Sequence, residues 1–250
     1  MPILVLASFA LQIACAVHVV RSGRPMYWIW LLLIGSYLAV IVYVVVAVIP
    51  DLRNDPRGRA AARNVLDTID PERRRREIRQ RLDVADTVDN RKALADECLR
   101  LGDHANAAEL YRSTLKGIHA NDPTLMLGLA QAEAGAGDFA SARVTLDALI
   151  KANPQFRSAD GHLLYARCLE ELGEHDKAIE EYDVLARSYP GEEARVRYGS
   201  LLMKCGRRGD ARGVFEDVLK RARLAPGYYR RKEQAWISAA QRELSSMGSA

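Results

Sequence analysis

Two acid–histidine pairs contain the side chains whose types could carry out proton transfer: Asp103 with His104, and His175 with Asp176. An imidazole next to a carboxylate can act as a general acid or base. Both pairs, however, lie just after a glycine in a turn sequence, where polar residues are ordinary. The sequence has no glycine-rich phosphate loop, no His/Cys/Asp cluster at metal-ligand spacing and no nucleophile elbow. We therefore predict that the protein is not an enzyme and that it has no catalytic residues, no metal and no cofactor.

Charged residues are distributed very unevenly along the 250 residues. Residues 1–50 hold only Arg21 and Arg24, whereas residues 51–250 hold 34 of the 36 Lys and Arg and all 32 Asp and Glu. The chain therefore divides near Pro50 into an apolar part and a charged part.

The apolar part contains two long uncharged runs, Pro2–Val20 with 19 residues and Met26–Ile49 with 24. At about 1.5 Å per helical residue, each is long enough for a hydrocarbon core of roughly 30 Å. The first run lacks the basic start of a cleaved signal peptide, because "MPILVLASFA" has no Lys or Arg. We therefore expect a transmembrane hairpin whose loop is "RSGRP", flanked by three interfacial aromatic residues: Tyr27, Trp28 and Trp30.

The basic residues around the two runs predict the orientation of this hairpin. The loop has two arginines, but four follow Ile49 within about 15 residues. By the positive-inside rule the charged part is cytoplasmic, which predicts a multi-pass protein of a bacterial inner membrane. The four cysteines show no CxxC or other paired spacing, which suits a reducing compartment: Cys15, Cys98, Cys168 and Cys205.

The stretch "GRPMYWIWLLLIGSYLAVIVYVVVAVIPDL" resembles the N-terminal membrane hairpin of phospholipase D-type nucleases and cardiolipin synthases. The chemistry of those enzymes would require the motif HxKxxxxD twice. The nearest segment is "HDKAIEEYD", in which His175 and Lys177 fit, but Tyr182 stands at the Asp position and Asp183 comes one residue late. No second copy occurs, so we do not expect phosphohistidine chemistry.

Four segments of the charged part align as helix, tight glycine turn, helix: "LADECLRLGDHANAAELYRSTL", "LAQAEAGAGDFASARVTLDAL", "YARCLEELGEHDKAIEEYDVL" and "YGSLLMKCGRRGDARGVFEDVL". The turn glycines are separated by 35, 36 and 33 residues. Small residues stand seven before and five after each glycine, and a bulky apolar residue follows nine after it. Helices cross closely only where small side chains meet, so this spacing predicts stacked helix pairs.

This pattern resembles the tetratricopeptide repeat (TPR) over residues 88–221, including the terminal prolines Pro154 and Pro190. The resemblance implies an all-α fold: a two-helix transmembrane hairpin, then an α-solenoid of about four helix pairs. The segment "APGYYRRKEQAWISAAQRELSS" predicts one final amphipathic capping helix. The expected domains are the hairpin (1–50), a basic juxtamembrane linker and helix (51–86), the TPR array (87–221) and the capping helix and tail (222–250).

The TPR resemblance also implies a peptide-binding groove lined by the first helix of each pair. TPR proteins that bind C-terminal acidic peptides have Asn at the place of Asp96, so we expect an extended or helical protein segment as the partner instead. The groove positions of the family fall on ten residues: Lys92, Asp96, Leu127, Gln131, Leu163, Arg167, Glu170, Val196, Ser200 and Met203.

The segment "DTIDPERRRREIRQRLDVAD" predicts a basic helix in the linker, capped by Asp70 with Pro71 at its first position. Its arginines could hold anionic lipid headgroups at about 1 kcal/mol each: Arg73, Arg74, Arg75 and Arg76. The alternative is a solvated spacer neutralised by its own glutamates. Nucleic acid is not an expected partner, because residues 86–221 hold 19 basic and 23 acidic side chains.

The sequence as a whole favours a membrane-anchored adaptor or scaffold, whose cytoplasmic TPR groove binds a protein or peptide. The alternative is an accessory or regulatory subunit of a membrane enzyme of phospholipid chemistry, acting through the hairpin.

Overall fold

The computed structural model describes residues 70–248 and, nearer the N-terminus, residues 13, 15–17, 19–20, 27–28, 30 and 42. The chain divides into two compact units, Met1–Arg73 and Arg74–Ala250. Apart from these few positions, the expected membrane hairpin and the start of the linker lie outside the described residues. Within the described residues, no helix combines the length and the apolar character that crossing a membrane requires.

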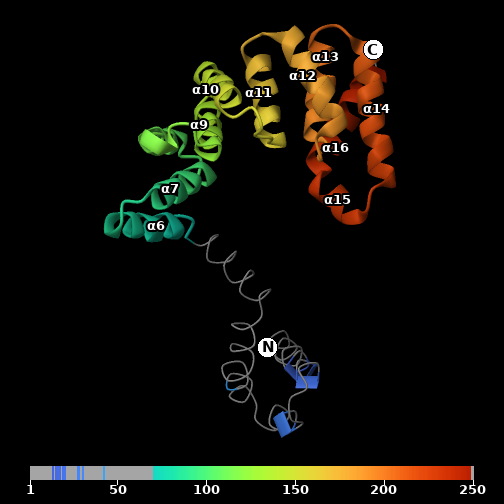
Figure 1. Ribbon diagram of the computed structural model, residues 1–250. Helices are drawn as coiled ribbons and strands as arrows, with labels where there is room; N and C mark the ends of the chain where they lie inside the picture. Colours follow the sequence, from blue (N-terminus) through green and yellow to red (C-terminus); the bar gives the residue numbers. More distant parts are fainter. Residues whose placement is uncertain are drawn as a thin grey trace. The chain divides into compact units, whose positions relative to one another are not determined.

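The second unit is all-α, and its helices follow one another as antiparallel pairs (Figure 1). The four pairs are α7 (Val88–Arg100) with α8 (His104–Thr114), α9 (Pro123–Gly135) with α10 (Phe139–Ala152), α11 (Ala159–Glu171) with α12 (His175–Ser188), and α13 (Glu193–Lys204) with α14 (Arg208–Leu224).

The turn inside each pair is built on a glycine with positive φ, as the sequence predicts. The φ angles are 79° at Gly102, 85° at Gly137, 78° at Gly173 and 78° at Gly206. The residue after each glycine donates its N–H to the carbonyl five residues back, for example Asp103 to Cys98 at 2.9 Å. This pattern ends a helix in the left-handed conformation that only glycine adopts without strain.

The repeated small and bulky residues form the helix crossings, which confirms the predicted spacing. All the small residues are buried, and the alanines among them have no exposed area: Ala95, Ala107, Ala130, Ala142, Ala166, Ala178, Gly199 and Ala211. The bulky residues nine after each glycine are at most 2% exposed: Tyr111, Leu146, Tyr182 and Phe215.

Each apolar core joins one helix pair to the first helix of the next pair. The core of α7 and α8 includes Leu125 and Leu129 of α9. The core of α9 and α10 includes Leu164 of α11, and that of α11 and α12 includes Leu201 of α13. Each pair is therefore completed by its neighbour, as in other solenoids.

The last core is completed by α16 (Gln234–Gly248), which packs on α13 and α14. Its Ala240 is fully buried, and Trp236 packs beside it. The single final helix expected from the sequence is divided in two, because the short α15 (Gly227–Lys232) ends at Glu233. The Glu233 carboxylate is turned inward and accepts the backbone N–H of Glu192 at 3.0 Å. Ala235, beside Trp236 in the chain, is exposed.

At the other end, α6 (Arg73–Val84) packs on the first helix pair. Ile78 is 7% exposed within that core, and Leu82 packs against it. This helix therefore has an apolar face that binds the array, instead of standing apart from it as a spacer. The helix begins two residues after Pro71. Between α8 and α9 the chain forms a short 3₁₀ turn, η2 (Gly117–His119).

Candidate functional site

One residue of each first helix lies six positions before the turn glycine and has an exposed or half-buried side chain. We call this row the first-helix face; it consists of Asp96, Gln131, Arg167 and Ser200. All four belong to the predicted groove. Neighbouring first helices touch, since α7 contacts α9 and α9 contacts α11, so the face runs from one pair to the next.

Asp96 is bound to two side chains of its own helix pair. The Tyr111 hydroxyl donates to one carboxylate oxygen, and the Lys92 Nζ lies 2.7 Å from the other. Burial, followed by the hydrogen bond and charge of Asp96, raises the pKa of Tyr111, which keeps this hydroxyl protonated as a donor. Asp96 and Lys92 therefore neutralise each other.

Glu170 makes a similar arrangement two pairs further along. It accepts the Tyr182 hydroxyl at 2.9 Å and the Lys204 Nζ at 2.7 Å. Lys204 belongs to α13, so this contact joins the third pair to the fourth. The Glu170 side chain is only 8% exposed, and its charge is compensated within the protein.

Arg167 lies on the same face but, within residues 70–248, it has neither a hydrogen bond nor an ion pair. Its side chain is half-buried, and Gln131 on α9 is exposed. A half-buried guanidinium with five unused donors can bind a carboxylate or carbonyl of a partner. The first-helix face therefore offers one positive charge between two carboxylates that are already paired.

Two of the apolar residues predicted for the groove lie in the cores. Leu163 is 5% exposed and Val196 is 3% exposed, so neither side chain is available to a ligand. Leu127 and Met203 are half-buried and pack against the cores of the second and fourth pairs. Only part of each of these two side chains can contact a ligand.

The arginines of α6 face carboxylates of the first helix pair. Arg74 Nε lies 3.4 Å from Glu97, which is 3% exposed, and Arg75 lies 3.2 Å from Asp103. Arg73 and Arg76 also interact within the chain. The expected lipid contact would therefore compete with contacts that these side chains already make.

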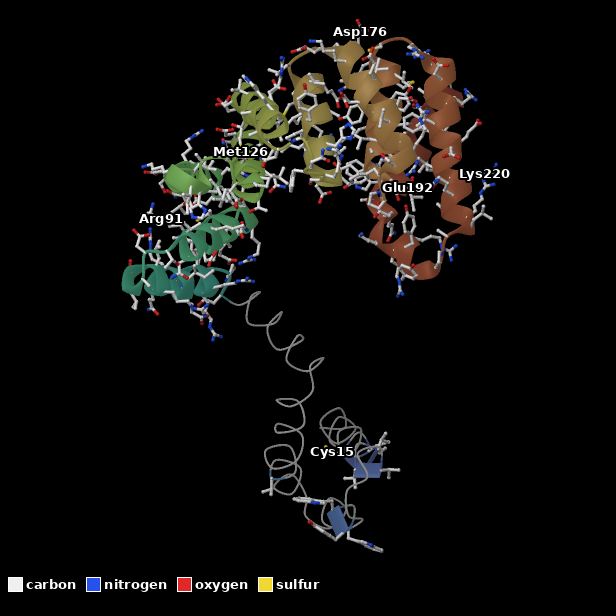
Figure 2. The ribbon with its side chains drawn as sticks, in the orientation of Figure 1. Cys15, Arg91, Met126, Asp176, Glu192 and Lys220 are labelled. Atoms are coloured by element: carbon white, nitrogen blue, oxygen red, sulfur yellow. The ribbon has the colours of Figure 1, made fainter. Side chains whose placement is uncertain are left out.

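The two acid–histidine pairs lie at the starts of two different helices, α8 and α12. Asp103 accepts from Arg75 and from Asn106, while the His104 ring packs against Gly135. His175 and Asp176 are both exposed, and Figure 2 labels Asp176 near the start of α12. Across the described part of the chain, no group of three or more His, Cys, Asp or Glu side chains is arranged to hold a metal ion.

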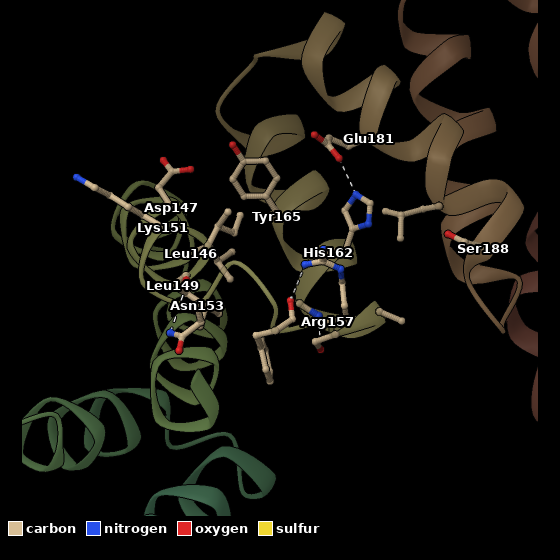
Figure 3. Close-up of a pocket in the computed structure, with 16 residues that line it drawn as sticks. Leu146, Asp147, Leu149, Lys151, Asn153, Arg157, His162, Tyr165, Glu181 and Ser188 are labelled. Atoms are coloured by element: carbon tan, nitrogen blue, oxygen red, sulfur yellow. Dashed lines mark hydrogen bonds and ion pairs between the residues drawn. The ribbon is translucent and has the colours of Figure 1, made fainter. Parts of the chain in front are cut away.

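A pocket of about 710 Å³ lies between α10 of the second pair and α11 and α12 of the third (Figure 3). Sequence reasoning did not identify it. Its apolar wall consists of Leu146, Leu149, Ile150, Phe156 and Leu185.

Two acidic side chains of this pocket have partners in the protein. A His162 ring nitrogen lies 2.6 Å from the Glu181 carboxylate, as the dashed line in Figure 3 marks. Asp147 lies 3.5 Å from Arg143. Burial, followed by the charge and hydrogen bond of Asp147, raises the pKa of Tyr165.

Comparison with known families matches residues 127–193 to the tetratricopeptide repeat. Curated protein sequences yield no match. Among solved structures, the chain is similar to TTC0263, a thermophilic TPR protein of Thermus thermophilus, with 20% identity and a TM-score of 0.51 over 67% of this chain and 87% of that one. This likeness shows the fold.

Two further solved structures are similar to a lesser degree. MamA is 18% identical, with a TM-score of 0.48 over 70% of this chain and 90% of its own. YrrB, described as a TPR protein with an unusual peptide-binding site, is 15% identical, with a TM-score of 0.48 over 68% of this chain and 87% of its own.

Proposed function

We propose that this TPR-type helical solenoid is a non-enzymatic adaptor that binds a protein partner on its first-helix face and is anchored to a membrane by its N-terminal hairpin. The family match over residues 127–193 supports protein binding, because protein or peptide binding is what TPR arrays commonly do. Repeat arrays present extended surfaces of this kind for their partners.

The observation that carries the proposal is the state of Arg167. The carboxylates of Asp96 on α7 and Glu170 on α11 are each bound by a lysine and a tyrosine. Arg167 is half-buried and, among the described residues, has no partner. Partly buried charges are generally paired, because desolvation without compensation is costly. A partner segment that offers a carboxylate or a backbone carbonyl to Arg167 would complete the face.

The membrane part of the proposal rests on composition. Residues 1–50 have two charged side chains, both in the five-residue break between the apolar runs. The excess of arginine after Ile49 favours a cytoplasmic location for the array at a bacterial inner membrane. An anchor of this kind would keep the adaptor close to membrane-bound partners.

Site-specific photo-crosslinking of the full-length chain in cells tests the binding face. The photoreactive residue is placed at Gln131 or Ser200 on the face, and at Glu216 or Lys220 on the exposed side of α14 (Lys220 is labelled in Figure 2). We expect a discrete adduct from the first two positions and none from the last two.

Arg167→Glu, introduced beside the crosslinker at Gln131, should abolish that adduct. Because Arg167 packs in no core, its replacement should change the free energy of unfolding by about 0.5 kcal/mol or less. Adducts that persist with Glu at this position, or that form only from α14, would remove the first-helix face as the binding site. Adducts that form only from the hairpin would favour the accessory-subunit alternative.

A further inference from the structure

The pocket between the second and third helix pairs is separate from the first-helix face. The α11 residues that line it are Ala159, Gly161, His162 and Tyr165, whereas Arg167 of the face is not among them. The pocket is therefore a second possible site, with its own chemistry.

The pocket has a largely apolar wall that the protein leaves partly uncovered. Leu149 and Leu185 are already buried, at 4% and 1% exposure. Ile150, on the same helix as Leu149, is 56% exposed, and Phe156 is half-buried. An occupant that covers Ile150 and Phe156 would remove apolar surface from water, at about 25 cal/mol per Å².

The pocket is lined by two acidic and two basic side chains, and both acidic ones have partners in the protein. Glu181 is held by His162, and Asp147 lies beside Arg143. Lys151 and Arg157 also line the pocket, yet nowhere in residues 70–248 does either pair with a carboxylate.

Arg157 retains donors that a ligand could use. Its Nη1 donates to the backbone carbonyls of Pro154 and Phe156, at 2.7 and 3.2 Å, so the Nε and Nη2 groups have no partner among the described residues. Lys151 comes from α10, and Arg157 comes from the connection to α11, so the two cations belong to different walls of the pocket (Figure 3). The complementary ligand group is a single anion with an apolar body.

We propose that this pocket binds a small amphiphilic carboxylate, whose acyl-like body lies on Ile150, Phe156 and Tyr165 and whose head binds Arg157, with Lys151 as the second cation of the lining. The volume of about 710 Å³ falls in the range of small-molecule sites, roughly 300–1,000 Å³. The pocket is confined to one junction between helix pairs and does not continue along the array, which favours a small molecule over an extended peptide.

Ser188 of α12 provides a local probe of occupancy. It lines the pocket and is exposed, and its hydroxyl bonds only to the Val184 carbonyl of its own helix. In the full-length Ser188→Cys variant, the rate of alkylation by a water-soluble maleimide is measured at this thiol by mass spectrometry. The native Cys205, which is exposed and outside the pocket, serves as the internal control.

Octanoate should slow alkylation of the Ser188→Cys thiol several-fold and leave the Cys205 rate unchanged. Octanol has the same chain without the charge, and acetate has the charge without the chain, so both should protect much less. Equal protection by octanol, or none by octanoate, would overturn the proposal. Protection by a short peptide with a C-terminal phenylalanine but not by octanoate would also overturn it, in favour of a polypeptide ligand.

Charge reversal tests the head group. With Lys151→Glu and Arg157→Glu in the same chain, octanoate should no longer protect the probe. The matched control is Lys220→Glu with Arg223→Glu on α14, two exposed residues that do not line the pocket. This control should retain full protection. Protection that survives reversal at Lys151 and Arg157 would show that the anion is not recognised there.

Discussion

The hydroxyl of Tyr182 on α12 donates a 2.9 Å hydrogen bond to the carboxylate of Glu170 on α11. The bulky residue at the crossing of the third helix pair therefore also provides a hydrogen-bond donor to a carboxylate on the other helix of that pair. Tyr111 and Asp96 make the same contact in the first pair. In the second and fourth pairs Leu146 and Phe215 take the tyrosine's place, and they have no donor.

Tyr182→Phe should destabilise the array by about 1–3 kcal/mol, because the buried Glu170 loses a donor that water cannot replace. Urea unfolding followed by circular dichroism measures this change. Tyr111→Phe is the matched comparison, since Asp96 is 49% exposed and can take a water molecule instead. A loss as large at Tyr111 as at Tyr182 would contradict this argument.

Gly199→Ala should be destabilising, by about 1–3 kcal/mol from overpacking, although alanine occupies the equivalent place in the other three pairs. An added Cβ would lie 2.6 Å from the Phe215 ring. Gly213→Ala in α14 is the control, because a Cβ there meets nothing within 4 Å. It should stabilise by about 0.5–1 kcal/mol through helix propensity. Thermal unfolding of both variants gives the comparison, and a stabilised Gly199→Ala protein would refute the close contact.

Tyr229 should make the stability of the cap depend on alkaline pH. Burial, then the hydrogen bond to Glu192, raises its pKa from 10.0 to about 12. Between these values the unfolded tyrosine loses its proton while the folded one keeps it. The contribution is therefore complete below pH 10 and is lost as the pH rises toward 12.

Urea titrations from pH 9 to 12, about the range that this linkage covers, measure the free energy of unfolding. With rising pH it should fall less steeply in Tyr229→Phe than in the unchanged protein. Tyr228→Phe is the control, since that neighbouring side chain is 70% exposed, and its profile should match the unchanged protein. Identical slopes for all three proteins would show that Tyr229 does not titrate as described.

Lipid binding by the basic helix should increase when its internal partner is removed. Residues 51–250 should bind vesicles of acidic lipid, with binding that weakens as salt rises, since exposed charges are screened over about 8 Å at physiological ionic strength. Asp103→Asn removes the ion pair between Arg75 and Asp103 and should strengthen this binding in a co-sedimentation assay. Equal binding to neutral vesicles would leave only a structural role for these arginines.

A reporter that is active only outside the cytoplasm, fused after Ala250, should remain inactive, because the arginines after Ile49 favour the cytoplasmic side. The same reporter placed in the loop after Gly23 should be active. The reverse pattern would mean that the hairpin has the opposite orientation.

Local features of this fold are predictable from sequence where one residue type is physically required. The four turn glycines have φ near +80°, and the alanines of the crossings leave no room for larger side chains. Both requirements repeat with the period of the array, so they are visible without coordinates.

The features that the sequence did not predict depend on contacts between distant residues. Leu163 and Val196 were assigned to the groove although they are buried, because groove and core positions alternate closely along the same helix. The break at Glu233 depends on its bond to the Glu192 backbone, which lies on another helix. The pocket depends on the spacing of α10 and α11, which no local pattern encodes.

The shared cores also determine the order in which the array would come apart. A helix pair whose neighbour leaves loses part of its own core, so opening proceeds inward from the ends. At one end α16 is held by a fully buried alanine and several apolar side chains. At the other end α6 has a single buried side chain, Ile78. Amide hydrogen exchange in the array should therefore be fastest in α6 and should slow progressively toward the middle pairs. A pulling force transmitted from the N-terminal part of the chain would detach α6 first.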